Sequence, residues 1–208
     1  MTAVMASIAR DLLSPLLLVL VALETATGDP MVNVSGKIIL GVATASSSEF
    51  LGIPYATHER WGKPVDMLLA DLAGDTLNAT AFGPCCPQPA AVYAPNQREA
   101  CLNLNVFTPH PLPVSIAPVL VFIHGGGGTT GCSAQSLPPL YNGTNLLSRS
   151  TEPVVVVTIN YRLSVLASLY LEGAIADNLQ SRDQISALRW VRANIASFGG
   201  KRACACVC

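Results

Sequence analysis

Two short apolar runs dominate the hydrophobic pattern of the chain. Residues 119–123 and 154–159 are continuous stretches rich in β-branched side chains, and neither is interrupted by the polar positions that a strand with one wet face would show. Such runs are typical of central strands in a parallel sheet that is covered on both faces. We therefore expect the two segments to be buried, parallel neighbours.

More polar segments precede these runs. Residues 31–43 alternate loosely around a turn at positions 35–36, which predicts one or two short antiparallel strands. Residues 49–56 predict another short strand, and residues 102–107 alternate strictly and predict one more. The proline-containing stretch 57–100 shows no long period, so we expect an irregular surface segment there.

A helix is the last element that the pattern predicts. Ser181 and Gln184 form a capping-box pattern, with Ser181 as the expected N-cap and Asp177 as the alternative start. Two glycines at 199–200 would end the helix, and a shorter helix is expected near 146–149. The long helix would bury an apolar face made of Ile185, Leu188, Val191, Ile195 and Phe198. Strands of this kind followed by a helix predict an α/β fold.

Four consecutive glycines follow the first apolar run. They occupy positions 125–128, directly after His124. Glycine backbone can adopt positive φ and approach other groups closely, so a glycine loop after a buried strand can direct several N–H groups at one spot. Such a spot suits a bound anion or the oxyanion of acyl transfer, although a flexible turn would show the same residues. We expect His124 to support this loop through a hydrogen bond rather than to act as a base.

Composition restricts the class of protein. The chain has 208 residues, of which 50% are hydrophobic and 12% are charged, with a net charge of −1. This length suits one domain with a core of its own. The scattered basic residues do not form the positive patch of a nucleic-acid-binding protein, so we expect no nucleic-acid partner.

The N-terminus resembles a secretion signal. An apolar run at 12–23 is about 12 residues long, too short to span a bilayer that needs roughly 20. Small residues at 26–28 follow it, so we expect residues 1–28 to be a signal peptide cleaved near Gly28, with a membrane anchor or an unprocessed apolar end as alternatives. No stable membrane span and a secreted, extracellular protein are therefore expected. Three glycosylation sequons, at Asn33, Asn78 and Asn142, agree with export.

Seven cysteines leave at least one without an intrachain partner. Cys101 follows the adjacent pair Cys85 and Cys86 by about 15 residues, a loop length that a disulfide stabilises by roughly 3 kcal/mol. We expect Cys86, in preference to Cys85, to bond Cys101, and no partner is evident for Cys132. The cysteines within 201–208 fit neither a redox motif nor a zinc site, so this segment is expected to be an unstructured cysteine-rich tail.

Five stretches in order resemble the N-terminal part of the type-B carboxylesterases, the family that includes cholinesterases and their adhesion relatives. They are residues 50–56, 99–109, 118–127, 154–162 and 182–200. The resemblance implies that residues 29–200 form part of one carboxylesterase domain. Its fold would be an incomplete α/β-hydrolase fold, in which N-terminal antiparallel strands are followed by parallel strands and a crossover helix.

The resemblance also implies roles for particular residues. It assigns Gly126 and Gly127 as oxyanion-hole donors through their backbone N–H groups. It suggests two ion pairs, Arg162 with Asp183 and Arg60 with Glu99, for which the alternative is solvated surface charge. The implied substrate is a small-molecule carboxylic ester, and no cofactor or metal is expected.

Departures from the family pattern bear on activity. The chain contains no Gly-x-Ser-x-Gly pentapeptide, the motif that carries the nucleophile, and the acid and histidine that follow it in this fold are missing as well. Ala100 and Gly128 replace a usual Asp and a usual aromatic residue. We therefore expect a truncated carboxylesterase that lacks activity. The alternatives are a secreted, non-catalytic adhesion or binding module and a truncated gene product without function.

The remaining candidates are weaker. His58 and His110 are expected to be solvated loop residues, and loop serines such as Ser133 lack the strand-to-helix context of a nucleophile. Tyr93 lies near the position of a cation-binding aromatic residue in cholinesterases, but an exposed tyrosine at the rim is the simpler interpretation.

Overall fold

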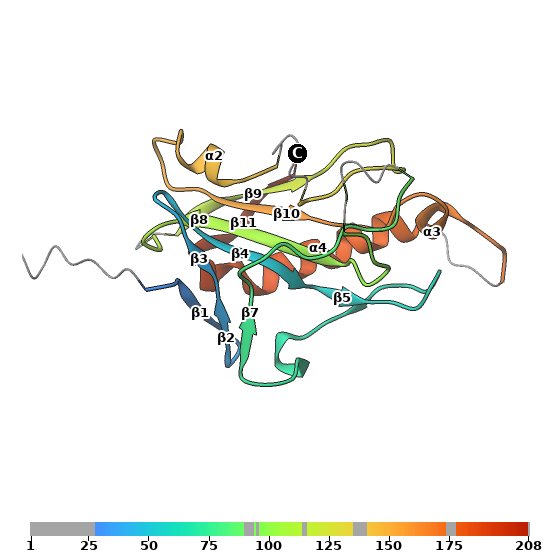
Figure 1. The fold of residues 1–208 in the computed structure, drawn as a ribbon, viewed down its shortest axis with the longest axis horizontal. Coiled ribbons are helices and arrows are strands. Elements are labelled where there is room, and N and C mark those ends of the chain that lie inside the picture. The colour runs from blue at the N-terminus through green and yellow to red at the C-terminus, as the bar shows by residue number, and fades with distance from the viewer. Residues whose placement is uncertain are drawn as a thin grey trace, which may run out of the picture.

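A computed structural model describes residues 28–89, 94, 96–113, 116–134, 141–173 and 178–207. Within these residues the main sheet has six strands in the order β11-β9-β10-β8-β4-β3 (Figure 1). Its strands are β3 (Val42–Ala43), β4 (Ser47–Pro54), β8 (Asn103–Pro109), β9 (Ala117–Ile123), β10 (Val155–Ile159) and β11 (Gly200–Val207).

The centre of this sheet is parallel, as the apolar runs predict. β9 and β10 pair in parallel with Val119 opposite Val155 and Ile123 opposite Ile159. β8 joins β10 in the antiparallel sense, and β4 joins β8 likewise. Antiparallel strands therefore lead into a parallel unit, which confirms the expected incomplete α/β-hydrolase fold.

Smaller elements surround the main sheet. β1 (Met31–Val34) and β2 (Lys37–Leu40) form the expected hairpin, whose turn places Ser35 at φ 53° and Gly36 at φ 90°. Among the described residues of the stretch expected to be irregular, regular structure is limited to short pieces: β5 (Ala56–Thr57), β6 (Val65–Asp66), a 3₁₀ helix η1 (Leu69–Asp71) and β7 (Thr76–Asn78), which pairs with β2.

Burial differs between the two central strands. All of β10 is buried, whereas β9 buries Ala117, Val119 and Val121 but leaves Leu120 and Phe122 partly exposed. The expectation that both strands are covered on both faces is therefore wrong for β9. On its open side lies a hollow of about 880 Å³ next to the short helix α2 (Thr144–Leu147), with Leu146 and Tyr141 in its wall.

The long helix α4 (Leu179–Asn194) covers the opposite face and continues into a 3₁₀ helix, η3 (Ile195–Phe198) (Figure 1). It begins three residues earlier than Ser181 predicts, after Asn178 in a left-handed conformation, so Ser181 is an exposed helical residue and not the N-cap. Ile185 is 48% exposed and lies outside the buried face. That face consists of Leu179, Asp183, Ser186, Ala187, Trp190 and Val191.

The segment expected to be an unstructured tail is a strand. β11 pairs in parallel with β9, with Ala205 opposite Val119 and Val207 opposite Val121. Gly199, at φ 82°, turns the chain after η3, and the open edge of β9 supplies the backbone groups that β11 needs. A small helix, α3 (Val165–Ser168), completes the described elements. None of the described helices has the length and apolar character needed to cross a bilayer.

Candidate functional site

The glycine loop leaves the carboxyl end of β9 and folds back on itself. Gly126, Gly127 and Gly128 have φ values of 116°, 62° and 72°. The Gly126 carbonyl accepts hydrogen bonds from the backbone N–H groups of Thr129 at 3.1 Å and Thr130 at 3.2 Å. The Thr129 hydroxyl donates to the same oxygen at 3.0 Å. A side chain at Gly126 would lie 1.9 Å from the Thr130 carbonyl oxygen, so this close return requires glycine.

These contacts determine where two N–H groups point. A trans peptide is planar, with its carbonyl and the following N–H on opposite sides. Because the Gly126 carbonyl points back at Thr129 and Thr130, the Gly127 N–H points out of the loop. The Gly125 carbonyl points at the His124 imidazole, 3.0 Å from Nδ1, so the Gly126 N–H points away from that ring. Within the described part of the chain, no protein group accepts from either N–H.

His124 supports the start of the glycine loop. Its side chain is buried and stacks on the Tyr161 ring at 4.4 Å, and the Tyr161 hydroxyl donates to the His124 carbonyl. Nδ1–H donates to the Gly125 carbonyl, which leaves Nε2 as a buried acceptor without a partner among the described residues. Burial lowers the pKa of His124 below its ordinary value, so the ring stays neutral.

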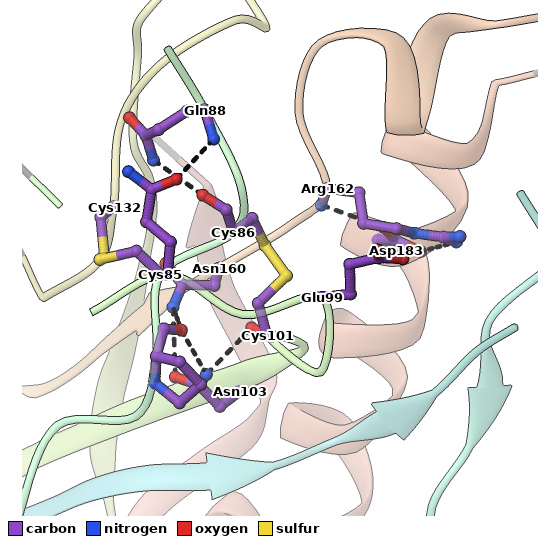
Figure 2. Close-up of a disulfide and its surroundings, with 12 residues drawn as sticks. Cys85, Cys86, Gln88, Glu99, Cys101, Asn103, Cys132, Asn160, Arg162 and Asp183 are labelled. Carbon is purple, nitrogen blue, oxygen red and sulfur yellow. Dashed lines mark hydrogen bonds and ion pairs between the residues drawn. A yellow bond between two sulfur atoms is a disulfide. The ribbon is translucent and has the colours of Figure 1, made fainter. Parts of the chain in front are cut away.

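The segment after β10 connects the loop to α4. Ser164 N–H donates to the Gly128 carbonyl at 2.8 Å. Two residues earlier, Arg162 donates to Asp183 through Nε at 2.7 Å and Nη2 at 2.6 Å, and both side chains are almost fully buried (Figure 2). The Arg162 backbone N–H donates to Asp183 at 3.1 Å, so the pair fixes the backbone beside the loop.

The second ion pair has a different setting. Arg60 Nε donates to Glu99 at 3.0 Å, but the Arg60 side chain is 60% exposed. The Arg60 guanidinium lowers the pKa of Glu99. His58, expected to be solvated, is half-buried and places Nε2 2.9 Å from the Glu99 carbonyl, and His110 lies 2.9 Å from the Ser48 hydroxyl. Both histidines therefore take part in local structure.

Two disulfides lie beside the loop (Figure 2). Cys86 bonds Cys101, and Cys85 bonds Cys132 across 47 residues. The second bond corrects the expectation that Cys132 has no partner. It was missed because spacing along the chain indicates only short-range pairs, whereas folding brings Cys132 back to the adjacent cysteines.

Sequence reasoning also missed a buried amide network beneath the loop. Asn105 Nδ2 donates to the Ser133 hydroxyl at 3.1 Å and to the Thr158 hydroxyl at 2.9 Å. Asn160 Oδ1 accepts from Ser133 N–H at 2.8 Å, and Asn103 donates to the Pro84 carbonyl at 2.9 Å. The strict alternation of residues 102–107 predicted a strand but not where the Asn103 and Asn105 side chains would lie. Those amides satisfy buried backbone and hydroxyl groups.

The remaining predicted residues are dispersed. Asn33 and Asn78 are exposed, and Asn142 is half-buried at the hollow beside β9. The expected signal peptide and Tyr93 lie outside the described residues.

Comparison with known proteins places these features in a wider context. The family model described as "Carboxylesterase family" matches residues 28–205. Para-nitrobenzyl esterase of Bacillus subtilis is 44% identical over 79% of this chain and 34% of its own length. A secreted lipase of Arthroderma benhamiae is 34% identical over 84% of this chain and 33% of its own.

Solved structures of esterases resemble this fold. A thermophilic para-nitrobenzyl esterase superposes with a TM-score of 0.76 at 35% identity, over 86% of this chain and 38% of that structure's chain. The chain thus spans about a third of the length of the relatives that it matches.

Proposed function

The chain belongs to the carboxylesterase family, and from this premise we propose that it provides the oxyanion-hole portion of a serine-dependent carboxylic-ester hydrolase. In this proposal the Gly126 and Gly127 N–H groups donate to the carbonyl oxygen of a small-molecule ester. The supporting observation is the orientation of these two N–H groups. The Gly125 carbonyl is hydrogen-bonded to His124 and the Gly126 carbonyl to Thr129 and Thr130, so the N–H group of each of these peptides points the opposite way. Each such donor contributes on the order of 3 kcal/mol to stabilising the transition state.

The chemistry of ester hydrolysis fits this site. Attack by a serine hydroxyl forms a tetrahedral intermediate and moves negative charge onto the former carbonyl oxygen. Donors already fixed in place stabilise that charge without reorganising. A nucleophile is a separate requirement, and the 208 residues hold no Gly-x-Ser-x-Gly motif. We therefore propose that the chain by itself does not turn over esters.

We further propose an extracellular setting. Two disulfides within the described residues are typical of oxidising compartments, and one relative is a secreted lipase. In this proposal residues 1–28 act as the signal peptide, and Asn33, Asn78 and Asn142 are glycan acceptors.

A chimera tests the proposed role of the loop. Residues 28–200 would replace the matching part of Bacillus subtilis para-nitrobenzyl esterase, and aryl-ester hydrolysis would be measured with the unmodified chain alongside. The chimera should hydrolyse the ester in an organophosphate-sensitive way, while the chain alone should not.

Two alanine variants of the chimera separate the loop from general strain. Gly126→Ala meets the Thr130 carbonyl and should lower kcat by about 10²- to 10³-fold, the size seen when an oxyanion donor is lost. Gly74 also has a positive φ, 70°, but open space around it, so Gly74→Ala should keep kcat. A folded chimera whose kcat is unchanged by Gly126→Ala would refute the oxyanion role.

A further inference from the structure

The far end of the glycine loop is held by a short arm of the chain at residues 84–88. Cys132, one residue after Gly131, is bonded to Cys85, and both cysteines are buried. The Gln88 side chain binds Gly131 twice. Its Oε1 accepts from Gly131 N–H at 2.8 Å, and its Nε2 donates to the Gly131 carbonyl at 2.8 Å. A covalent bond and a two-point amide contact therefore act on neighbouring residues. Figure 2 shows the disulfide between Cys85 and Cys132, with Gln88 on the same arm.

The arm is anchored at its base. The Pro84 carbonyl accepts from Asn103 Nδ2 at 2.9 Å and from Asn160 Nδ2 at 3.1 Å. A second link, the disulfide between Cys86 and Cys101, joins the arm to the chain just before β8. The buried start of β8 and end of β10 thus hold the arm, and the arm in turn holds the end of the loop.

Gly131, the residue that the arm holds, lies next to the groups that orient the Gly126 N–H. Gly131 has a φ of 120°, and a side chain there would lie 2.3 Å from His124 Nδ1 and 2.5 Å from the Gly125 carbonyl oxygen. The Gly131 backbone therefore packs closely beside the imidazole–carbonyl contact that sets the direction of the Gly126 N–H. Displacement of Gly131 would remove the steric wall against which that contact is packed.

We propose that Gln88 and the Cys85–Cys132 disulfide are positioning groups for the glycine loop, and that they set the direction of the Gly126 and Gly127 N–H groups. The catalytic part of this inference rests on the proposed function, whereas the mechanical part does not. None of these three side chains needs to touch the substrate, since they act through Gly131.

Site-resolved amide hydrogen exchange on the full chain tests the mechanical part. The Thr129 and Thr130 N–H groups bond the Gly126 carbonyl, so their exchange reports the closed loop. The double variant C85S/C132S should speed their exchange about tenfold, because it removes one of the two constraints on the end of the loop and leaves the Gln88 contact with Gly131 in place. The matched control C86S/C101S removes a disulfide from the base of the arm and should affect these amides less than the N–H groups near Cys101.

Gln88→Met keeps both disulfides, so it tests the positioning role even if C85S/C132S fails to fold. It should speed exchange at Thr129 and Thr130 and shift the Gly126 and Gly127 amide resonances while leaving those of β10 in place. Gln88→Glu keeps the acceptor for Gly131 N–H but loses the donor, so its exchange should fall between wild type and Gln88→Met. Unchanged exchange and shifts in Gln88→Met would overturn the positioning role.

In the esterase chimera the same variants separate the two claims. Gln88→Met should lower kcat about tenfold with KM nearly constant, because donors misaligned in the transition state leave ground-state binding intact. Faster amide exchange at Thr129 and Thr130 without any loss of kcat would support the positioning role of Gln88 and refute the oxyanion role of the loop. A loss of kcat without faster exchange would refute the positioning role.

Discussion

Arg162 and Asp183 form a bidentate ion pair that is shielded from water, with side-chain exposures of 1% and 0%. A third Arg162 nitrogen, Nη1, donates to the Gly62 carbonyl at 2.8 Å. The pair therefore joins three segments that are distant in sequence: the end of β10, helix α4 and the stretch between β5 and β6. It also lies two residues from Ser164, which holds the glycine loop at Gly128.

Removing the charge from Asp183 should destabilise the chain strongly. Asp183→Asn leaves the buried guanidinium without its counter-charge, which costs about 3–5 kcal/mol in comparable buried pairs. Urea denaturation followed by tryptophan fluorescence would measure the change. Glu99→Gln breaks the exposed pair with Arg60 and is the matched control, since water screens that pair and the midpoint should hardly move. Equal midpoint shifts in the two variants would contradict this ranking.

Acid should destabilise the chain partly through His124. Burial lowers the pKa of His124 below the unfolded value of about 6.5. Above that value the ring is neutral in both states. As the pH falls below it, the unfolded chain takes up a proton that the folded chain refuses, so folding stability declines until the pH reaches the folded pKa.

The variant His124→Asn tests this pH dependence. It keeps an amide donor near the Gly125 carbonyl but cannot titrate. The difference in unfolding free energy between pH 7.5 and pH 5.5 should therefore be smaller in the variant than in wild type. An identical difference in both proteins would assign the acid sensitivity to other titrating groups. Glu99 is not one of them, because its pKa is lowered and it therefore affects stability only at more acidic pH.

Gly131 should tolerate no side chain. A Cβ there would overlap His124 Nδ1 and the Gly125 carbonyl oxygen, and φ is 120°. We expect Gly131→Ala to cost more than about 3 kcal/mol of stability, from steric overlap and backbone strain together. Gly36 also has positive φ but no neighbour within 4 Å, so Gly36→Ala should cost about 1 kcal/mol. Denaturation midpoints of the two variants would show whether overlap or strain dominates.

The three sequons should differ in glycan occupancy when the chain is made in a secretory host. Asn33 and Asn78 are exposed. Asn142 is half-buried, and the hydroxyl of Thr144, the third residue of its sequon, is bonded to Ser47 at 2.6 Å and donates to Glu49. Once this region folds, the acceptor site is closed to the transferase, so site-resolved mass spectrometry should find Asn142 the least occupied. Equal occupancy at all three sites would show that glycan transfer outruns folding.

The pattern of residues close together in the sequence predicted the main elements of this fold. The β-branched runs predict β9 and β10, because a short unbroken stretch of such residues is typical of central strands in a parallel sheet. The positions 35–36 predict the hairpin turn, because Gly36 accepts positive φ without a Cβ penalty. The glycine run after β9 marks the loop, because only glycine allows so close a backbone return.

The same local reasoning failed where a distant partner decided the outcome. Ile185 is exposed and Ser186 is buried, because the buried face of α4 carries polar residues with distant partners: Asp183 bonds Arg162, and the Ser186 hydroxyl donates to Asp66. The alternating segment of β11 pairs with β9 because β9 had an open edge, a fact that no spacing within 201–208 contains.

By itself, the sequence determined which segments could be buried strands, where the backbone could turn and which family the chain resembles, since these depend on residues adjacent in the chain. Only the tertiary structure decided that Cys85 meets Cys132, that Gln88 grips Gly131 and that Asn103 and Asn105 face inward. Each of these contacts joins residues far apart in sequence. Such pairs form only when the burial of the whole sheet offsets the entropy of closing the loops between them.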